Sequence, residues 1–205
     1  MLLKNTKLLF ALLFLSLSAT QAQAAGENGS AAKQVVEKFQ AELIDVMKNG
    51  KKLGYGGRYE KLFSSVSNSH DLTKMARVIV GKEWEKLSID QQQKLVDSIS
   101  RWSVAEYAHN FNDFGGESFV FDSEEETPRG GVVVHSRLIV PDDKEVKFDY
   151  MLKGNDNAWR IIDIIANGVS NLALRRSEYT SILQNEGFDA LIAKINGKIE
   201  NYSKL

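Results

Sequence analysis

Cysteine is absent from the 205 residues, and this absence removes several classes of chemistry. Without thiols the chain has no disulfide, no zinc–thiolate site, no thiol nucleophile and no dithiol redox motif. A domain of this length buries enough apolar surface to stand without disulfides. We therefore expect its stability to come from its packed core.

An excess of charge of one sign is also missing. Lysine and arginine number 26, aspartate and glutamate number 27, and no basic tract occurs. Binding to nucleic acid rests on cations that neutralise phosphates, so nucleic acid is excluded as a partner. Beyond the N-terminal segment, no run of 18 apolar residues predicts a membrane-spanning helix.

Common catalytic and binding motifs are missing as well. The sequence contains no G-x-S-x-G, no H-E-x-x-H, no Walker A loop and no EF-hand loop. The glycine-rich stretch 54–59 lacks the third glycine of a dinucleotide-binding fingerprint and follows no predicted strand. These motifs therefore point to no enzyme class and no cofactor.

The N-terminus has the pattern of a secretory signal peptide. Lys4 and Lys7 precede an apolar run over 8–17, and Ala22-Gln23-Ala24 provides a small-x-small cleavage site. The run is shorter than the about 20 residues that a membrane-spanning helix requires. Cleavage after Ala24 removes the two lysines and changes the net charge from −1 to −3. We predict export to a bacterial periplasm, with a signal peptide over 1–24, a linker over 25–30 and one domain over 31–205.

Apolar residues at helical spacing predict the first elements of the domain. One helix ends at Asn49-Gly50, and another covers 71–80. Between them, the glycine-rich segment 51–59 predicts a surface loop. Ser88 and Gln91 form a capping box, which predicts the start of a long helix.

After this helix the hydrophobic period changes from about 3.6 to 2, which predicts strands. Short turn sequences, among them Glu124-Glu125-Glu126 with Pro128, favour antiparallel pairing. Two helices follow, one with Val169 and Leu172 on its apolar side and one over 188–202. The order predicts an α+β fold in which helices before and after an antiparallel meander pack on one face of the sheet. At least four strands are expected, over 118–121, 131–140, 145–153 and 159–165.

The isolated histidines and the acidic run do not predict a metal site. His70, His109 and His135 lie in different predicted elements, so surface or capping roles are expected. The run 124–126 lacks the ligand spacing of a calcium site. We expect it at the charged tip of a hairpin.

Two charged residues interrupt apolar patterns. Asp163 lies between Ile161 and Ile165, where a buried carboxylate with a raised pKa could act as a base. Its apolar neighbours favour a structural ion pair or hydrogen bond instead. Arg176 interrupts a helical apolar stripe, so it is expected to pair with Asp163, to snorkel, or to share an anionic ligand with Arg175.

A set of motifs covers nearly all of the predicted domain in a fixed order. From the C-terminus backwards they are Gly187-Phe188-Asp189, Arg176-Ser177-Glu178-Tyr179, Trp159-Arg160-Ile161-Ile162-Asp163, Gln91-Gln92-Gln93 and Met75-Ala76-Arg77. In this order they resemble the MlaC family of periplasmic lipid-transfer proteins, also called the toluene-tolerance family. Within it, four further segments look similar to the hopanoid-associated branch, HpnM: 46–50, 53–55, 57–59 and 148–150.

The resemblance implies a lipid carrier with no catalytic residue and no cofactor. Acyl chains would lie in a cleft between the sheet and the helices, with the head group near solvent. It also implies two partners, an outer-membrane lipoprotein complex and an inner-membrane ABC transporter with its MCE-protein subunit. The residues expected to line the lipid pocket are Met75, Val78, Trp102, Phe148, Tyr150, Ile161, Val169, Leu172, Arg176 and Tyr179.

Two other functions stay open on the sequence. One is an enzyme in which Asp163 acts as acid or base on a lipid or steroid-like substrate. The other is a lipid-free periplasmic adaptor that carries an exposed apolar patch. Phospholipid and hopanoid both require only an apolar pocket, so the sequence leaves the lipid and the direction of transport undecided. No coiled-coil heptad occurs, so we expect a monomer.

Overall fold

The structure is a computed structural model, and it describes residues 29–142, 144–154 and 158–204. The predicted signal peptide over 1–24 and the first part of the predicted linker lie outside the described residues. Within the described ranges, no helix is long and apolar enough to cross a membrane.

The first helix, α1 (Ala31–Lys48), begins and ends where the sequence predicts. The hydroxyl of Ser30 caps it by accepting a hydrogen bond from the backbone N–H of Lys33 at 3.1 Å. Asn49 ends it, and the next helix, α2 (Gly50–Ser69), starts immediately. The two helices therefore form a hairpin with almost no connecting loop.

The predicted surface loop over 51–59 is wrong, because this segment belongs to α2. The helix is broken only at Gly54, whose φ of 61° and ψ of −179° are accessible to glycine and costly for other residues. Arg58 holds the segment in place from inside the protein. Its guanidinium donates to the carbonyls of Ala108 at 2.7 Å and Gly50 at 3.1 Å. Tertiary contacts thus override the weak helix propensity of the glycines.

The middle helices agree with the prediction. α3 (Leu72–Val80) is followed by a short 3₁₀ helix, η1 (Gly81–Lys86), and by the long helix α4 (Ile89–Asn110). The capping box at the start of α4 is present. The hydroxyl of Ser88 accepts from the backbone N–H of Gln91 at 3.2 Å, and the Gln91 side chain accepts from the backbone N–H of Ser88 at 2.9 Å.

The sheet is an antiparallel meander, as predicted, with a fifth short strand. Its first strand is longer than expected, and Glu124 to Glu126 pair with the second strand, so the predicted hairpin tip is wrong. The backbone of an exposed edge strand pairs regardless of its charged side chains, which reach solvent. The strands, in spatial order, are β1 (Ser118–Thr127), β2 (Gly131–Val140), β3 (Lys144–Lys153), β4 (Arg160–Ala166) and β5 (Val169–Ser170).

Two helices complete the chain, α5 (Asn171–Asn185) and α6 (Phe188–Lys204). The hydroxyl of Ser170 caps α5 by accepting from the backbone N–H of Ala173 at 3.0 Å. Val169 was predicted on the apolar side of this helix. It lies instead in β5, before the cap, and is 52% exposed.

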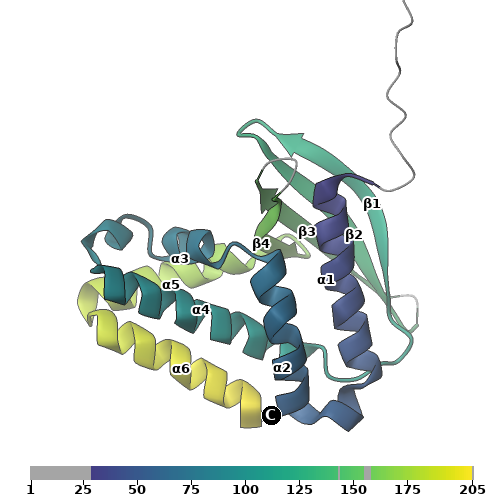
Figure 1. The fold of residues 1–205 in the computed structure, drawn as a ribbon, viewed down its shortest axis with the longest axis horizontal. Helices are drawn as coiled ribbons and strands as arrows, with labels where there is room; N and C mark the ends of the chain where they lie inside the picture. Colours follow the sequence, from purple (N-terminus) through teal and green to yellow (C-terminus); the bar gives the residue numbers. More distant parts are fainter. Residues whose placement is uncertain (1–28, 143, 155–157, 205) are drawn as a thin grey trace, which may run out of the picture.

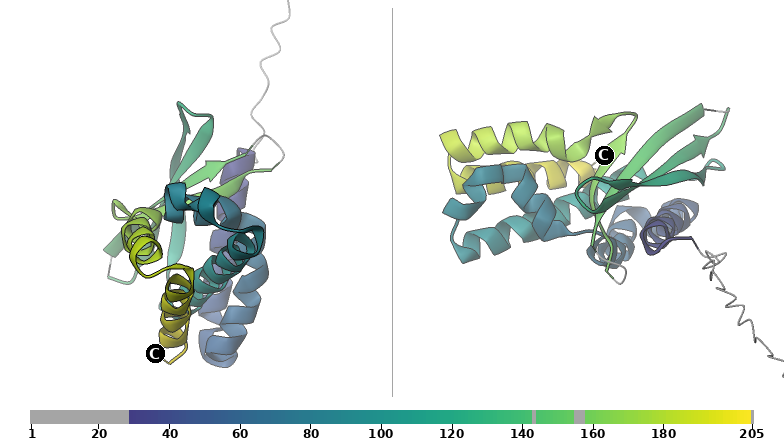
Figure 2. Two further views of the ribbon diagram at one scale, coloured as in Figure 1. Left: turned by 90° about the vertical axis from the view of Figure 1, so that its left-hand side faces the viewer. Right: turned by 90° about the horizontal axis from the view of Figure 1, so that it is seen from above.

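The elements enclose two hydrophobic clusters rather than one. The first lies between the α1–α2 hairpin and the sheet, and the second lies among α3, α4, α5 and α6. Figure 1 shows α1 running along the sheet with α2 next to it, and α3, α4, α5 and α6 extending away from the sheet. The views in Figure 2 show the same separation of the sheet from the helical bundle. Helix α4 joins the two, since Val104 and Ala108 belong to the first cluster and Ile99 and Trp102 to the second.

Candidate functional site

A small cavity lies where the two clusters meet. Four of the residues predicted to line a lipid pocket form part of its wall: Met75, Trp102, Ile161 and Leu172. They come from four elements, α3, α4, β4 and α5, which the fold brings together at this cavity. The cavity has a volume of only about 20 Å³. Such a space holds about one water molecule and no acyl chain.

Two titratable side chains on this cavity are withdrawn from solvent, His70 fully and Tyr107 in part. The imidazole of His70 lies 2.8 Å from the Ser69 hydroxyl through Nδ1 and 3.1 Å from the Tyr107 hydroxyl through Nε2. Burial lowers the pKa of His70 from 6.5 to about 4, although a hydrogen bond with the Val66 backbone opposes this shift. Burial also raises the pKa of Tyr107 well above its ordinary value. Both side chains are therefore neutral at neutral pH.

Asp163 lies on the same cavity and is held by hydrogen bonds. Its carboxylate accepts from the Ser170 hydroxyl at 2.6 Å and from the backbone N–H of Leu172 at 3.3 Å. Burial raises its pKa, and these hydrogen bonds oppose the rise. The prediction of a structural hydrogen bond is confirmed. The carboxylate links the middle of β4 to the start of α5.

The predicted pairing of Arg176 with Asp163 is wrong. Arg176 is exposed on α5, and its guanidinium lies beside Gly81. Its neighbour Arg175 is the arginine that pairs, with Glu106 on α4 at 3.0 Å. Arg175, and not Arg176, therefore lies on the side of α5 that faces α4.

The three histidines lie apart from one another in the structure, in different elements. His109 packs on the ring of Tyr202, and His135 pairs with Asp149 at 2.7 Å on the sheet. Neither lies on the cavity that contains His70. Among the described residues no group of three or more histidine, aspartate or glutamate side chains could hold a metal ion.

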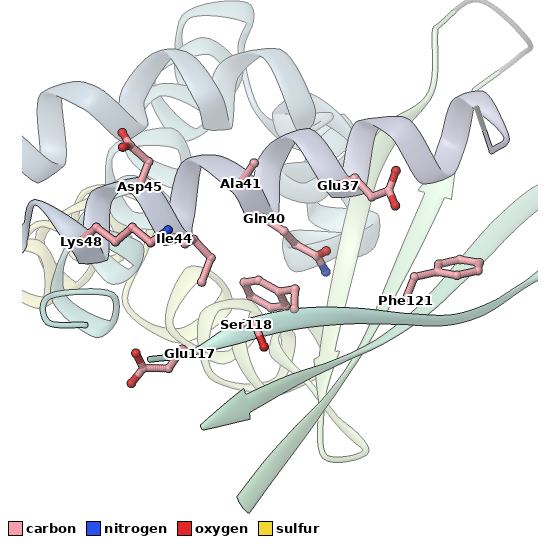
Figure 3. A pocket seen from close by; sticks show the side chains of 10 residues that line it. Glu37, Gln40, Ala41, Ile44, Asp45, Lys48, Glu117, Ser118 and Phe121 are labelled. Atoms are coloured by element: carbon pink, nitrogen blue, oxygen red, sulfur yellow. The ribbon is translucent and has the colours of Figure 1, made fainter. Parts of the chain in front are cut away.

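A much larger space lies between α1 and β1. It is an open groove of about 510 Å³, which is within the range of about 300–1,000 Å³ typical of ligand sites. Figure 3 shows side chains of α1 and of the start of β1 facing each other across it. Its apolar walls are formed by Ala41 and Ile44 on α1 and by Phe119 and Phe121 on β1.

Simple periodicity places these side chains in the groove. On α1, residues Glu37, Gln40, Ala41 and Ile44 follow the spacing i, i+3, i+4, i+7, so they lie on one face beside the core stripe. On β1, the two phenylalanines are two residues apart and point to the same side of the sheet. A second helical stripe of mixed polarity is therefore the signal that sequence reasoning missed.

An aromatic row connects the groove to the core. The ring of Phe119 packs edge-on against Phe148 on β3 at 6.0 Å between centroids, and Phe148 packs against Tyr150 at 6.1 Å. Phe148 and Tyr150 are two of the predicted pocket residues. Neither lies on the groove wall, but Phe119 links both to it.

The rim of the groove is charged. Glu37, Asp45 and Glu117 bring carboxylates to it, and Lys48 brings one ammonium group. The first two carboxylates have partners, since Glu37 lies 3.5 Å from Lys33 and Asp45 pairs with Lys61. The groove thus combines apolar walls with a polar edge at the surface.

The other predicted pocket residues are spread over the molecule. Tyr179 is fully buried in the second cluster and Val78 packs against it, while Val169 and Arg176 are at the surface. Of the predicted set, only Met75, Trp102, Ile161 and Leu172 line the small cavity. The set contains none of the residues that line the open groove.

An α+β fold with an open groove of apolar side chains is the architecture of a protein that binds an apolar ligand. The chain belongs to the MlaC family, because the family model, described as MlaC protein, matches residues 37–197. This family consists of periplasmic, non-enzymatic lipid carriers. The predicted family is therefore confirmed, and the alternative of an enzyme that uses Asp163 is not supported.

One solved structure shares most of the fold. It is the phospholipid-binding protein from Ralstonia solanacearum in complex with a phospholipid, with a TM-score of 0.71. The similarity covers 84% of this chain and 98% of that chain at 18% sequence identity. Similarity at this identity supports the fold and leaves the ligand of the present chain to be determined. A search of curated proteins found no match.

Proposed function

We propose that this protein carries a phospholipid across the periplasm and that the groove between α1 and β1 receives the lipid's acyl chains. The observation that carries the proposal is the groove itself, which has apolar walls, opens to solvent and has about 510 Å³ of space. The small cavity at the junction of the two clusters, at about 20 Å³, cannot hold an acyl chain.

The physical need for a carrier follows from the hydrophobic effect. Moving the acyl chains of a phospholipid, with about 30 methylene groups, into water costs at least about 20 kcal/mol of free energy, at about 0.8 kcal/mol for each group. Transfer from a bilayer to an apolar groove leaves the surroundings of the chains almost unchanged. The carrier therefore removes the barrier but sets no direction, and differential binding by its partners must do so.

Export, partners and assembly state belong to the same proposal. The predicted signal peptide over 1–24 would direct the chain to the periplasm. There it would exchange lipid with an inner-membrane ABC transporter and its MCE-protein subunit, and with an outer-membrane lipoprotein complex. We expect the carrier to act as a monomer.

A hopanoid is the alternative ligand. The segments 46–50, 53–55, 57–59 and 148–150 resemble the HpnM branch of the family. In the structure, the first of these segments ends α1, and Phe148 and Tyr150 belong to the aromatic row behind the groove. These positions support a ligand with a rigid ring system as well as one with acyl chains.

The test is to identify the lipid that the protein carries. The processed protein is purified from the periplasm without detergent and extracted with organic solvent, and bound lipids are measured by mass spectrometry. Near-stoichiometric phospholipid supports the proposal, and near-stoichiometric hopanoid supports the alternative. A folded protein without lipid would refute both and favour the lipid-free adaptor.

A pair of variants locates the site. Ala41→Trp places an indole in the groove and should lower the bound lipid severalfold. Ser67→Trp is the matched control, because Ser67 is exposed on α2 and lines neither the groove nor the small cavity. Equal lipid content in the two variants, with both folded, would exclude the groove as the lipid site.

A further inference from the structure

The floor of the groove contains a polar side chain that hydrocarbon alone would not require. Gln40 lies on α1 between the apolar residues of the wall and is only 6% exposed. Figure 3 shows its amide directed away from α1, into the space toward the strands. Burying an amide in an apolar site costs free energy unless the amide is hydrogen-bonded. A leucine or methionine would line a groove for acyl chains without this cost.

Protein groups satisfy only part of the amide. Its Nε2 donates to the hydroxyl of Ser136 on β2 at 2.9 Å. The amide also lies close to the phenol of Tyr150 on β3 and opposes the rise that burial causes in the pKa of Tyr150. A glutamine offers two N–H donors and a carbonyl with two lone pairs. The hydrogen bond to Ser136 uses one N–H, so the second N–H and the carbonyl remain for a further partner, and the open side of the site is the groove.

The charges around the groove decide what kind of group can bind there. The ammonium of Lys48 and the carboxylates of Glu37, Asp45 and Glu117 lie on its lining, whereas the groups beside Gln40 on the floor are the hydroxyls of Ser136 and Tyr150. A phosphate on the floor would be a buried charge without a cation, which is strongly unfavourable. The floor therefore suits an uncharged hydrogen-bonding group, and the charged head group belongs at the rim.

We propose that Gln40 binds an uncharged polar group of the lipid, either the ester carbonyl of a glycerolipid or the hydroxyl of a hopanoid. This inference rests on the proposed function and adds a specificity-determining residue to it. The contact sets how deep the lipid lies, because methylene groups on either side meet only the apolar walls. It also makes the protein prefer a lipid with this group to one of the same shape without it.

The test uses pairs of lipids that differ only in the polar group. Delipidated protein purified from the periplasm is incubated with vesicles that contain equal amounts of dioleoyl phosphatidylethanolamine and its diether analogue. The bound ratio is then measured by mass spectrometry. A second experiment uses the hopanoid alcohol diplopterol and the matching hydrocarbon diploptene. One neutral hydrogen bond predicts a preference of about three- to tenfold for the ester or for the alcohol.

The variant Gln40→Met keeps the volume of the side chain and removes the amide, so the preference should fall to about one. Gln40→Leu repeats the test with another shape. Ile44→Met is the matched control, because it changes an apolar wall residue of the same groove and should keep the preference.

Each outcome has one meaning. A preference in the first pair assigns the ester, and a preference in the second assigns the hydroxyl. Wild-type protein that binds lipid with no preference in either pair would overturn the role of Gln40 and leave the carrier function intact. A preference that persists in both Gln40 variants would also overturn it. Wild-type protein that binds none of the four lipids would refute the proposed function itself.

Discussion

His70 provides a direct test of how the two hydrophobic clusters are joined. Its imidazole is 3% exposed, lies on the small cavity with Glu106 and Asp163, and packs edge-on against Phe39 at 4.9 Å between ring centroids. The backbone N–H of the next residue, Asp71, donates to the carbonyl of Ile161 on β4 at 2.9 Å. The side chain is therefore fixed between the α1–α2 hairpin and the sheet, in a place where a charge is disfavoured.

The structure predicts the sign and size of a pH effect. The pKa of His70 falls from 6.5 to about 4 on folding, so the unfolded chain binds more protons between these values. Stability from this group is fully present above the unfolded pKa and decreases as the pH falls toward the folded one. The loss between about pH 7.5 and about pH 5 is about 2 kcal/mol.

The measurement is urea unfolding of wild-type protein and of His70→Gln at both pH values. Asp163 contributes with the opposite sign, because its raised pKa lets the native state bind more protons as the pH falls. Subtracting the two proteins cancels such shared contributions. We expect the pH-dependent loss of stability to be about 2 kcal/mol smaller in His70→Gln. An equal loss in the two proteins would refute the assignment of a neutral, buried His70.

Two further predictions concern the α1–α2 hairpin. Gly54→Ala should lower the free energy of unfolding by about 1–3 kcal/mol, because φ is 61° there. Gly56→Ala, which also has open space around the new methyl group, should raise the free energy of unfolding by up to about 1 kcal/mol. Equal effects in thermal or urea unfolding would contradict the break at Gly54. Arg58→Met should cost about 2–4 kcal/mol, because it leaves two buried carbonyls without their donor. The exposed Arg129→Met should stay within about 0.5 kcal/mol, and a similar loss in both would argue against the buried role of Arg58.

Local signals explain why most elements could be predicted. The capping box at Ser88 and Gln91 involves residues three apart, so it is complete in the sequence itself. The alternation along β3 likewise needs no knowledge of the partner strands, and the strand forms over Lys144–Lys153, close to the predicted range. Long-range contacts explain the failures. The helical conformation of 51–59 depends on a hydrogen bond from Arg58 to Ala108, fifty residues away. Local helix propensity carries no information about such a contact.

The candidate site shows the same division between what local signals predict and what long-range contacts decide. Apolar residues predicted for a pocket do become buried, but most of them pack against one another in two clusters. Helical periodicity cannot tell a residue that faces the core from one that faces an open groove a few tens of degrees away. Ile44 and Gln40 lie beside the core stripe of α1, and only the position of β1 turns that flank into a wall.

The sequence by itself determined the α+β class, the order of helices and meander, and the family, because periodicity, caps and motifs are properties of neighbouring residues. Only the tertiary structure decided that Asp163 is held by Ser170 and Leu172, that Arg175 pairs with Glu106, and that the open groove lies between α1 and β1. These features depend on distances between segments far apart in the chain. Such distances are set when the two hydrophobic clusters pack against each other through α4.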